Sequence, residues 1–133
     1  MIRRQTLNPA GLFDSRQYGF SQAVVVEGGR RMLLSGQVGV DEHEKTVEGG
    51  MGPQTVKALD NIDYLLKQAG GDLSHVVMLR IYIAQAAQDD QGPITEALRR
   101  YFPTDPPPSS WIIVTGLSLP EWLIEIEAEA VLP

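Results

Sequence analysis

The chain has 133 residues, the size of one domain, so we expect a single domain over residues 1–133. Its formal net charge of −6 argues against a nucleic-acid partner, because nucleic-acid binding depends on a cationic surface. The absence of cysteine excludes disulfides, thiolate metal sites and cysteine nucleophiles. No stretch approaches the roughly 20 apolar residues of a membrane span, and the first residues lack the apolar core of a signal peptide. We therefore expect a cytoplasmic protein without a membrane partner.

The first part of the chain predicts three strands. Residues 1–6 are compatible with a short edge strand, and residues 20–26, FSQAVVV, predict a second strand. A turn at Glu27-Gly28-Gly29 predicts that residues 31–38, RMLLSGQV, return as the hairpin partner of the second strand. Gly36 interrupts this third strand, which predicts a β-bulge or a close approach of another group to the backbone.

The middle of the chain predicts two helices separated by a strand. After a polar, glycine-rich loop at residues 41–52, Pro53 suits the first turn of a helix. Apolar residues then follow at helical spacing until Gly70-Gly71 ends the helix. Residues 76–84, VVMLRIYIA, predict a strand, and residues 93–102 predict a second, shorter helix after a polar loop.

The last part of the chain predicts a rigid loop and two strands. Residues 102–114, FPTDPPPSSWIIV, contain four prolines that hold the backbone extended ahead of a short buried strand beginning at Trp111. Residues 123–131, LIEIEAEAV, predict the final strand. Its alternation places apolar residues on one face and three carboxylates on the other. These carboxylates are Glu125, Glu127 and Glu129.

The element order β–β–β–α–β–α–β–β predicts an α+β fold, with two helices packed on one face of a sheet of about six strands. Several strands, residues 76–84 most clearly, are apolar on both faces. The face without helices must then be buried in another way. Self-association is the simplest solution, because large exposed apolar patches are rare on monomers, and we expect a homo-oligomer.

Few patterns predict chemistry by themselves. The three glutamates are compatible with a solvated strand face, or with one carboxylate that points into a cleft, where it would hold a water molecule or relay a proton. Ser35-Gly36-Gln37 offers a hydroxyl and backbone donors at the end of a strand, although a bulge without function explains it equally well. Arg80, in the middle of an apolar strand, predicts a carboxylate partner across the sheet or a binding role at an interface.

Other candidates lack the partners that their chemistry requires. His43 and His75 have no metal-ligand or triad spacing, so we expect no metal and no cofactor. Ser109 and Ser110 have no base placed to activate a hydroxyl, which argues against a serine nucleophile. Trp111 is compatible with a packing residue or with the wall of a pocket.

Five segments, in this order, resemble one known family. They are residues 20–24 (FSQAV), residues 34–39 (LSGQVG), residues 54–70 (QTVKALDNIDYLLKQAG), the prolines that follow Phe102, and residues 124–128 (IEIEA). The chain is identified by them as a member of the Rid family, the YjgF-type reactive intermediate deaminases, also called L-PSP endoribonuclease-like. This resemblance implies a chorismate-mutase-like fold, a homotrimer, and small-molecule sites in the clefts between subunits.

The resemblance also implies a chemistry. Archetypal members hydrolyse 2-imino and 2-enamino acids to 2-keto acids and ammonia. An arginine holds the substrate carboxylate in two charge-assisted bonds, and an acid holds the attacking water. The acid corresponds to Glu125, and an aromatic residue near the first strand corresponds to Phe20. The remaining binding positions fall on Ser35, Gly36, Gln37, Ser109 and Trp111.

The arginine is the one part that this sequence lacks. The family places it after a proline pair, in a pattern such as P-P-A-R-S, and the corresponding residue here is Ser109. Serine cannot make the bidentate contact of a guanidinium. Archetypal 2-imino acid deamination is therefore in doubt for this chain, and Trp111 is expected to reshape the cleft.

These observations leave three alternative functions. The first is a deaminase or hydrolase that acts on a small imine, enamine or related metabolite, with Glu125 positioning water. The second is a non-catalytic trimer that binds a small metabolite or a protein partner in the same cleft. The third, the endoribonuclease or translation-inhibitor role of some relatives, is disfavoured by the acidic net charge and by the lack of a histidine pair.

Overall fold

A computed structural model describes residues 1–133. Its strands and helices follow the predicted order. They are β1 (Arg3–Leu7), β2 (Ala23–Glu27), β3 (Arg30–Val38), α1 (Met51–Gln68), β4 (Val76–Ala84), α2 (Gly92–Tyr101), β5 (Ser109–Val114) and β6 (Ile124–Leu132). Three short 3-10 helices, η1 (Ser15–Tyr18), η2 (Leu73–His75) and η3 (Gln85–Ala87), lie between them. α1 begins two residues before Pro53, which leaves the proline in the first turn, where it blocks no helical hydrogen bond.

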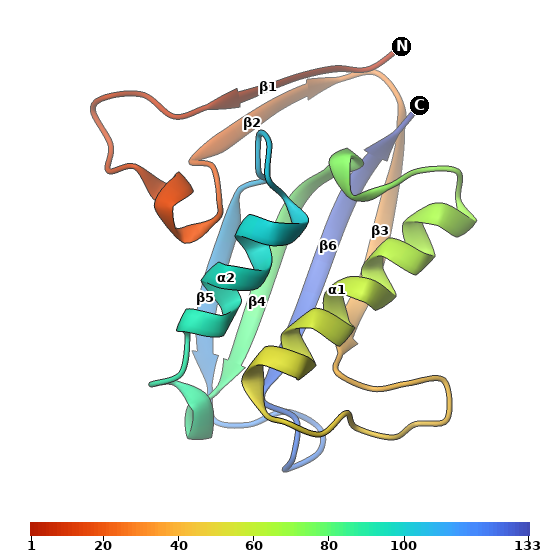
Figure 1. The fold of residues 1–133 in the computed structure, drawn as a ribbon. Coiled ribbons are helices and arrows are strands. Elements are labelled where there is room, and N and C mark those ends of the chain that lie inside the picture. The colour runs from red at the N-terminus through yellow and green to blue at the C-terminus, as the bar shows by residue number, and fades with distance from the viewer.

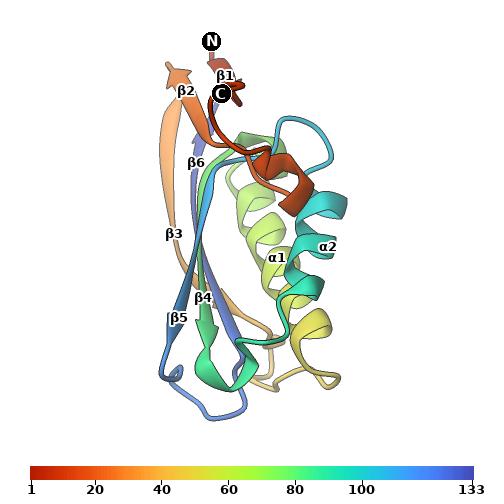
Figure 2. The same cartoon turned by 90° about the vertical axis from the view of Figure 1, so that its left-hand side faces the viewer.

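Four of the strands form a mixed sheet in the order β3-β6-β4-β5. β6 runs antiparallel to both β3 and β4, whereas β4 and β5 are parallel and are joined through α2. Both α-helices cover the same face of this sheet, and the opposite face, called here the open face, carries no helix (Figure 2). The α+β fold with two helices on one face of a mixed sheet is thereby confirmed. None of the helices is both long and apolar enough to span a membrane.

The predicted hairpin between the second and third strands is wrong. β2 pairs instead with β1, antiparallel and in a separate two-stranded sheet, with Val25 opposite Gln5. This pair crosses the end of the four-stranded sheet (Figure 1). The glycine turn is present, since Gly28 and Gly29 have positive φ angles of 77° and 78°. Long-range bonds from β1 to the body of the protein, which the local sequence pattern does not reveal, draw β2 away from β3.

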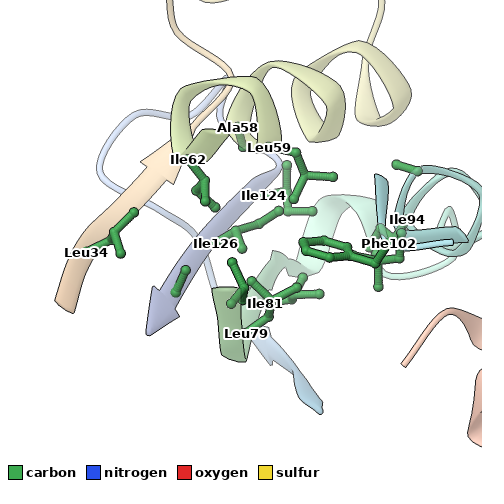
Figure 3. Packing of buried hydrophobic residues seen from close by; sticks show 14 of the residues in the cluster. Leu34, Ala58, Leu59, Ile62, Leu79, Ile81, Ile94, Phe102, Ile124 and Ile126 are labelled. Atoms are coloured by element: carbon green, nitrogen blue, oxygen red, sulfur yellow. The ribbon is translucent and has the colours of Figure 1, made fainter. Parts of the chain in front are cut away.

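The core lies between the two α-helices and the sheet (Figure 3). Leu59 and Ile62 of α1 pack over the inward residues of β4 and β6, and both have no exposed surface. The inward residues of β6 are Ile124, Ile126, Ala128 and Ala130. The alternation predicted for this strand is confirmed, and it turns the glutamates to the open face.

Candidate functional site

Most of the sequence-predicted site residues lie in two groups on opposite faces of the sheet. Trp111 of β5 pairs in register with Ile81 of β4, which is fully buried beneath the helices. Glu125 of β6 pairs with Tyr82, the next residue of β4, and therefore points to the open face. Residues opposite one another in register share a face, so Trp111 and Glu125 of one chain point in opposite directions.

The first group surrounds a hollow of about 520 Å³ between β5 and the start of α2. We call it the aromatic hollow. It is lined by Phe13, Tyr18, Phe20, Gln91, Gly92, Thr95, Ser109 and Trp111. Three of these residues, Phe20, Ser109 and Trp111, were predicted binding residues, and the fold brings them together.

Ser109 and Trp111 act as a unit within the aromatic hollow. The indole Nε1–H of Trp111 donates to Ser109 Oγ across 3.0 Å. The Phe20 ring lies against the indole, with ring centroids 6.2 Å apart and planes tilted by 51°. The hydroxyl of Ser109 therefore holds the indole in one orientation, and the indole forms a wall of the hollow.

A tightly bonded loop holds the other wall of the aromatic hollow. The buried Ser15 hydroxyl donates to the Phe20 carbonyl at 2.7 Å. Gly19 ends η1 with a φ of 93° and presses on α2, where any Cβ at this position would lie 2.7 Å from Leu98 Cβ. Only glycine combines this φ with such a close approach. The loop that carries Phe13, Tyr18 and Phe20 is thus fixed to the helix.

The second group lies at the end of the open face, between β3 and β6. Leu34 pairs with Ala128 and Gln37 with Ile126, so Ser35 and Gly36 together oppose the single residue between these partners. This arrangement is a β-bulge. The carboxyl group of Glu125 lies over Gly36, where a Cβ would stand 2.7 Å from the Glu125 carboxyl carbon. Both interpretations of Gly36, the bulge and the close approach, are confirmed.

Gln37 belongs to a different environment from the Glu125 carboxylate. Its side-chain amide donates to the Ser35 carbonyl at 3.2 Å. Gln37 and Gly36 line an open groove of about 630 Å³ beside α1. The polar side chains that line this groove include Lys57 and Asp60. Gly36 therefore borders both this groove and the Glu125 carboxylate on the open face.

Charged residues further along the open face neutralise one another. Arg80 Nη1 lies 2.8 Å from Glu129 Oε2, and Arg31 Nη2 lies 3.3 Å from Glu129 Oε1. The hydrogen bond from Arg80 holds the pKa of Glu129 below its ordinary value. The Tyr82 hydroxyl donates to Glu127, and this bond raises the pKa of Tyr82. Arg80 has a carboxylate partner across the sheet, which is the first of the two roles that its position predicted.

Sequence reasoning missed some residues of both groups. Phe13 and Tyr18 are 62% and 47% exposed, and their apolar rings lie in a segment broken by proline and glycine. Aromatic residues without a strand or helix pattern are the signal that could have identified them. Tyr82 was treated only as an apolar strand residue.

His75 caps η2 through its Nδ1, which accepts the Asp72 backbone N–H. No cluster of three His, Asp or Glu residues is arranged to hold a metal ion.

Comparison with known proteins identifies a family and several similar chains. A family model described as Endoribonuclease L-PSP matches residues 15–132. The 2-iminobutanoate/2-iminopropanoate deaminase of Rattus norvegicus is 35% identical over 113 residues, which cover 84% of this chain and 79% of that protein. Protein DfrA of Myxococcus xanthus is 33% identical over 113 residues, 84% of each chain.

A solved structure is similar over almost the whole length. The crystal structure of the conserved Rid-family protein YyfB from Yersinia pestis superposes with a TM-score of 0.90 and 36% sequence identity. The superposition covers 97% of this chain and 98% of that one.

Proposed function

This chain belongs to the Rid family, whose family model is described as Endoribonuclease L-PSP, and from that membership we propose that it is a deaminase-type hydrolase of a small imine or enamine. The observation that carries the proposal is the carboxylate of Glu125, half-buried over the Gly36 bulge on the open face. The deamination of 2-iminobutanoate and 2-iminopropanoate, after which its relative from Rattus norvegicus is named, fits a water-positioning carboxylate at this place.

The reaction consumes one water molecule and moves two protons from oxygen to nitrogen. Water adds to the carbon of the C=N bond while Glu125 accepts a proton from it and passes that proton to the nitrogen. The resulting carbinolamine then loses ammonia as its C–N bond breaks and a C=O bond forms. An enamine reaches the same intermediate after protonation to the imine. When the C–N bond breaks, Glu125 accepts the hydroxyl proton of the carbinolamine and passes it to the departing nitrogen, so the carboxylate is regenerated.

We further propose that the working site joins two copies of the chain in a homotrimer. β3 and β5 are opposite edges of the four-stranded sheet, so three strand spacings, roughly 14 Å, separate Ser35 from Ser109. Glu125 and Trp111 also point to opposite faces. A ligand the size of an imino acid cannot touch both groups of one chain, but it can lie between the Glu125 group of one copy and the aromatic hollow of another.

Ser109 changes which substrate this site accepts. In the Rid archetype the corresponding arginine pairs with the substrate carboxylate. Here the Ser109 hydroxyl is already engaged by the Trp111 indole, and no charged side chain lines the aromatic hollow. We therefore expect 2-imino acids to be poor substrates. The same neutral hollow favours the second candidate function, a trimer that binds a small metabolite without turnover.

Ammonia release from freshly generated 2-iminopropanoate tests the proposal. We expect little activity from the wild type and a gain in Ser109→Arg, because the new guanidinium can hold the carboxylate. Adding Glu125→Gln to Ser109→Arg should lower the rate by about 100-fold or more, because the water loses its proton acceptor.

Ser110→Arg is the matched control, since Ser110 pairs with Arg80 on the open face. No gain is expected from it. A gain in Ser110→Arg alone would contradict the site between two copies. The deaminase proposal would be overturned if no variant released ammonia, or if adding Glu125→Gln left the ammonia release of Ser109→Arg unchanged. The binding function would then remain.

A further inference from the structure

We propose that the aromatic hollow selects an uncharged, ring-bearing substrate, so that the natural substrate is an aromatic imine or enamine without a carboxylate at this end. The proposal rests on the function proposed above and specifies the substrate class of the same site. It follows from the walls of the hollow, from its lack of charge and from its rigidity.

Four aromatic rings form the walls. Phe20 lies against Trp111, and Phe13 meets Tyr18 edge to face, with centroids 6.4 Å apart and planes at 65°. Phe13 and Tyr18 are both exposed to solvent. Aromatic rings prefer edge-to-face and offset contacts. The two ring pairs around the hollow can make contacts of this kind with the ring of a ligand. Exposed apolar side chains gathered in this way mark a ligand groove.

The polar atoms of the hollow are all neutral. They come from the hydroxyls of Thr95, Ser109 and Tyr18 and from the amide of Gln91. A carboxylate placed here would lose hydration without gaining a cation, which is strongly unfavourable. A neutral imine, amide or hydroxyl would instead find donors and acceptors. The volume of about 520 Å³ is within the range of small-molecule pockets and exceeds the needs of a three-carbon imino acid.

The walls are held in place before any ligand arrives. The Gln22 side chain donates to the Phe13 carbonyl at 3.0 Å, and the Gln22 backbone N–H donates to Asn8 Oδ1 at 3.0 Å. Ser15 fixes Phe20, and Ser109 fixes the indole of Trp111. Binding to such a hollow requires little ordering of the protein, which favours affinity for a small ring.

Fluorescence of Trp111 tests the proposal directly. Trp122, the other tryptophan, bonds to Thr46 outside the hollow, so Trp122→Phe leaves Trp111 as the sole reporter. Three probes are titrated against the assembled protein. Phenylacetamide carries a ring without charge, phenylacetate carries the ring with a carboxylate, and acetamide has no ring. We expect phenylacetamide to bind at least about tenfold more tightly than either of the others, because only it combines the ring contact with neutrality.

A matched pair of variants locates the binding. Phe13→Ala should weaken phenylacetamide by about fivefold, because a ring contact is lost. Leu12→Ala should leave it unchanged, since Leu12 is a neighbouring residue, 54% exposed, that does not line the hollow. Ser109→Arg should reverse the preference in favour of phenylacetate.

The outcomes separate this inference from the proposed reaction. The substrate class would be overturned if phenylacetate and phenylacetamide bound equally well. It would also be overturned if Trp111 did not respond to phenylacetamide at millimolar concentration. Either result would hold even if Ser109→Arg hydrolyses 2-iminopropanoate. Selective binding of phenylacetamide together with no ammonia release by any variant would support an uncharged, ring-bearing ligand for the aromatic hollow and refute only the deaminase reaction.

Discussion

Glu129 lies between two guanidinium groups on the open face, with Arg80 at 2.8 Å and Arg31 at 3.3 Å. The hydrogen bond from Arg80 is the main reason that the pKa of Glu129 is lowered in the folded state. A lowered pKa means that folding favours the ionised carboxylate. The resulting stabilisation is present above the pKa of glutamate in the unfolded chain and is lost as pH falls through the lower pKa of the folded state.

A pH-dependent effect of Glu129→Gln follows. At pH 7 the variant should lower the free energy of unfolding by up to about 1 kcal/mol, since the partner Arg80 is 41% exposed and solvent screens the pair. At pH 2.5 the difference should nearly vanish. Urea unfolding at both values measures it, and Glu27→Gln serves as the control, because Glu27 meets Arg3 only at 3.8 Å on an exposed surface. A difference that is the same at both pH values would contradict the pairing.

At the level of residues, the sequence predicts backbone features and strand faces better than it predicts side-chain rotamers and the bonds that depend on them. Gly36 in a strand indicated a bulge or a close approach, because few other reasons place glycine there. Alternation likewise predicted the face of Glu125. The bond between Trp111 and Ser109 could not be predicted, because it depends on the rotamer of an indole. The separation of Trp111 from Glu125 across the sheet required the strand order, which single residues do not encode.

At the level of elements, side chains of β1 bond this strand to the body of the protein, in addition to its pairing with β2. Arg4 Nη2 donates to the Val76 carbonyl at 2.9 Å, and Nη1 donates to the Asp105 carbonyl at 3.2 Å. Thr6 Oγ1 donates to the Asp105 carboxylate at 3.1 Å. Asp105 has a φ of 47°, so the proline-rich loop turns sharply to meet the strand. These bonds join residues about 70 to 100 positions apart, beyond the reach of local patterns.

Arg4→Met should therefore release β1 and β2 from the end of the four-stranded sheet. Arg4 is partly buried, and burial lowers the pKa of its guanidinium, so its bond to the Val76 carbonyl is made partly away from bulk water. We expect a loss of about 2 kcal/mol in the free energy of unfolding. Arg3→Met, a change to the adjacent and 80% exposed arginine, should cost less than about 0.5 kcal/mol.

Urea unfolding and amide hydrogen exchange measure the two variants. Exchange should accelerate in β1 and β2 of Arg4→Met and stay unchanged in α1. Equal destabilisation by the two substitutions would show that charge alone, and not the bonds of Arg4 to the loop and to β4, holds this pair of strands.

For the whole molecule, periodicity was sufficient to predict the number and order of the elements and the single helical face. It was not sufficient to place β1 and β2, since the position of that pair depends on Arg4 and Asp105. The open face was predicted to need cover, and in the single chain it carries no helix (Figure 2). Leu33, which lies opposite Glu129 on that face, is 67% exposed, and Ile112 is 37% exposed.

A homotrimer that buries the open face would explain these exposed residues, and Leu33→Asp tests it. The wild type should scatter light with three times the chain mass of 14.6 kDa. Leu33→Asp should shift the protein towards 14.6 kDa, because an unpaired carboxylate beside Glu129 would be buried at the contact. Leu119→Asp, at a 41% exposed position in the loop between β5 and β6, should keep the wild-type mass.

A trimer that survives Leu33→Asp would mean that the copies meet elsewhere, and the site between the Glu125 group and the aromatic hollow would then lose its structural basis. A wild type of 14.6 kDa would remove that site altogether, because one chain turns Glu125 and Trp111 to opposite faces of its sheet.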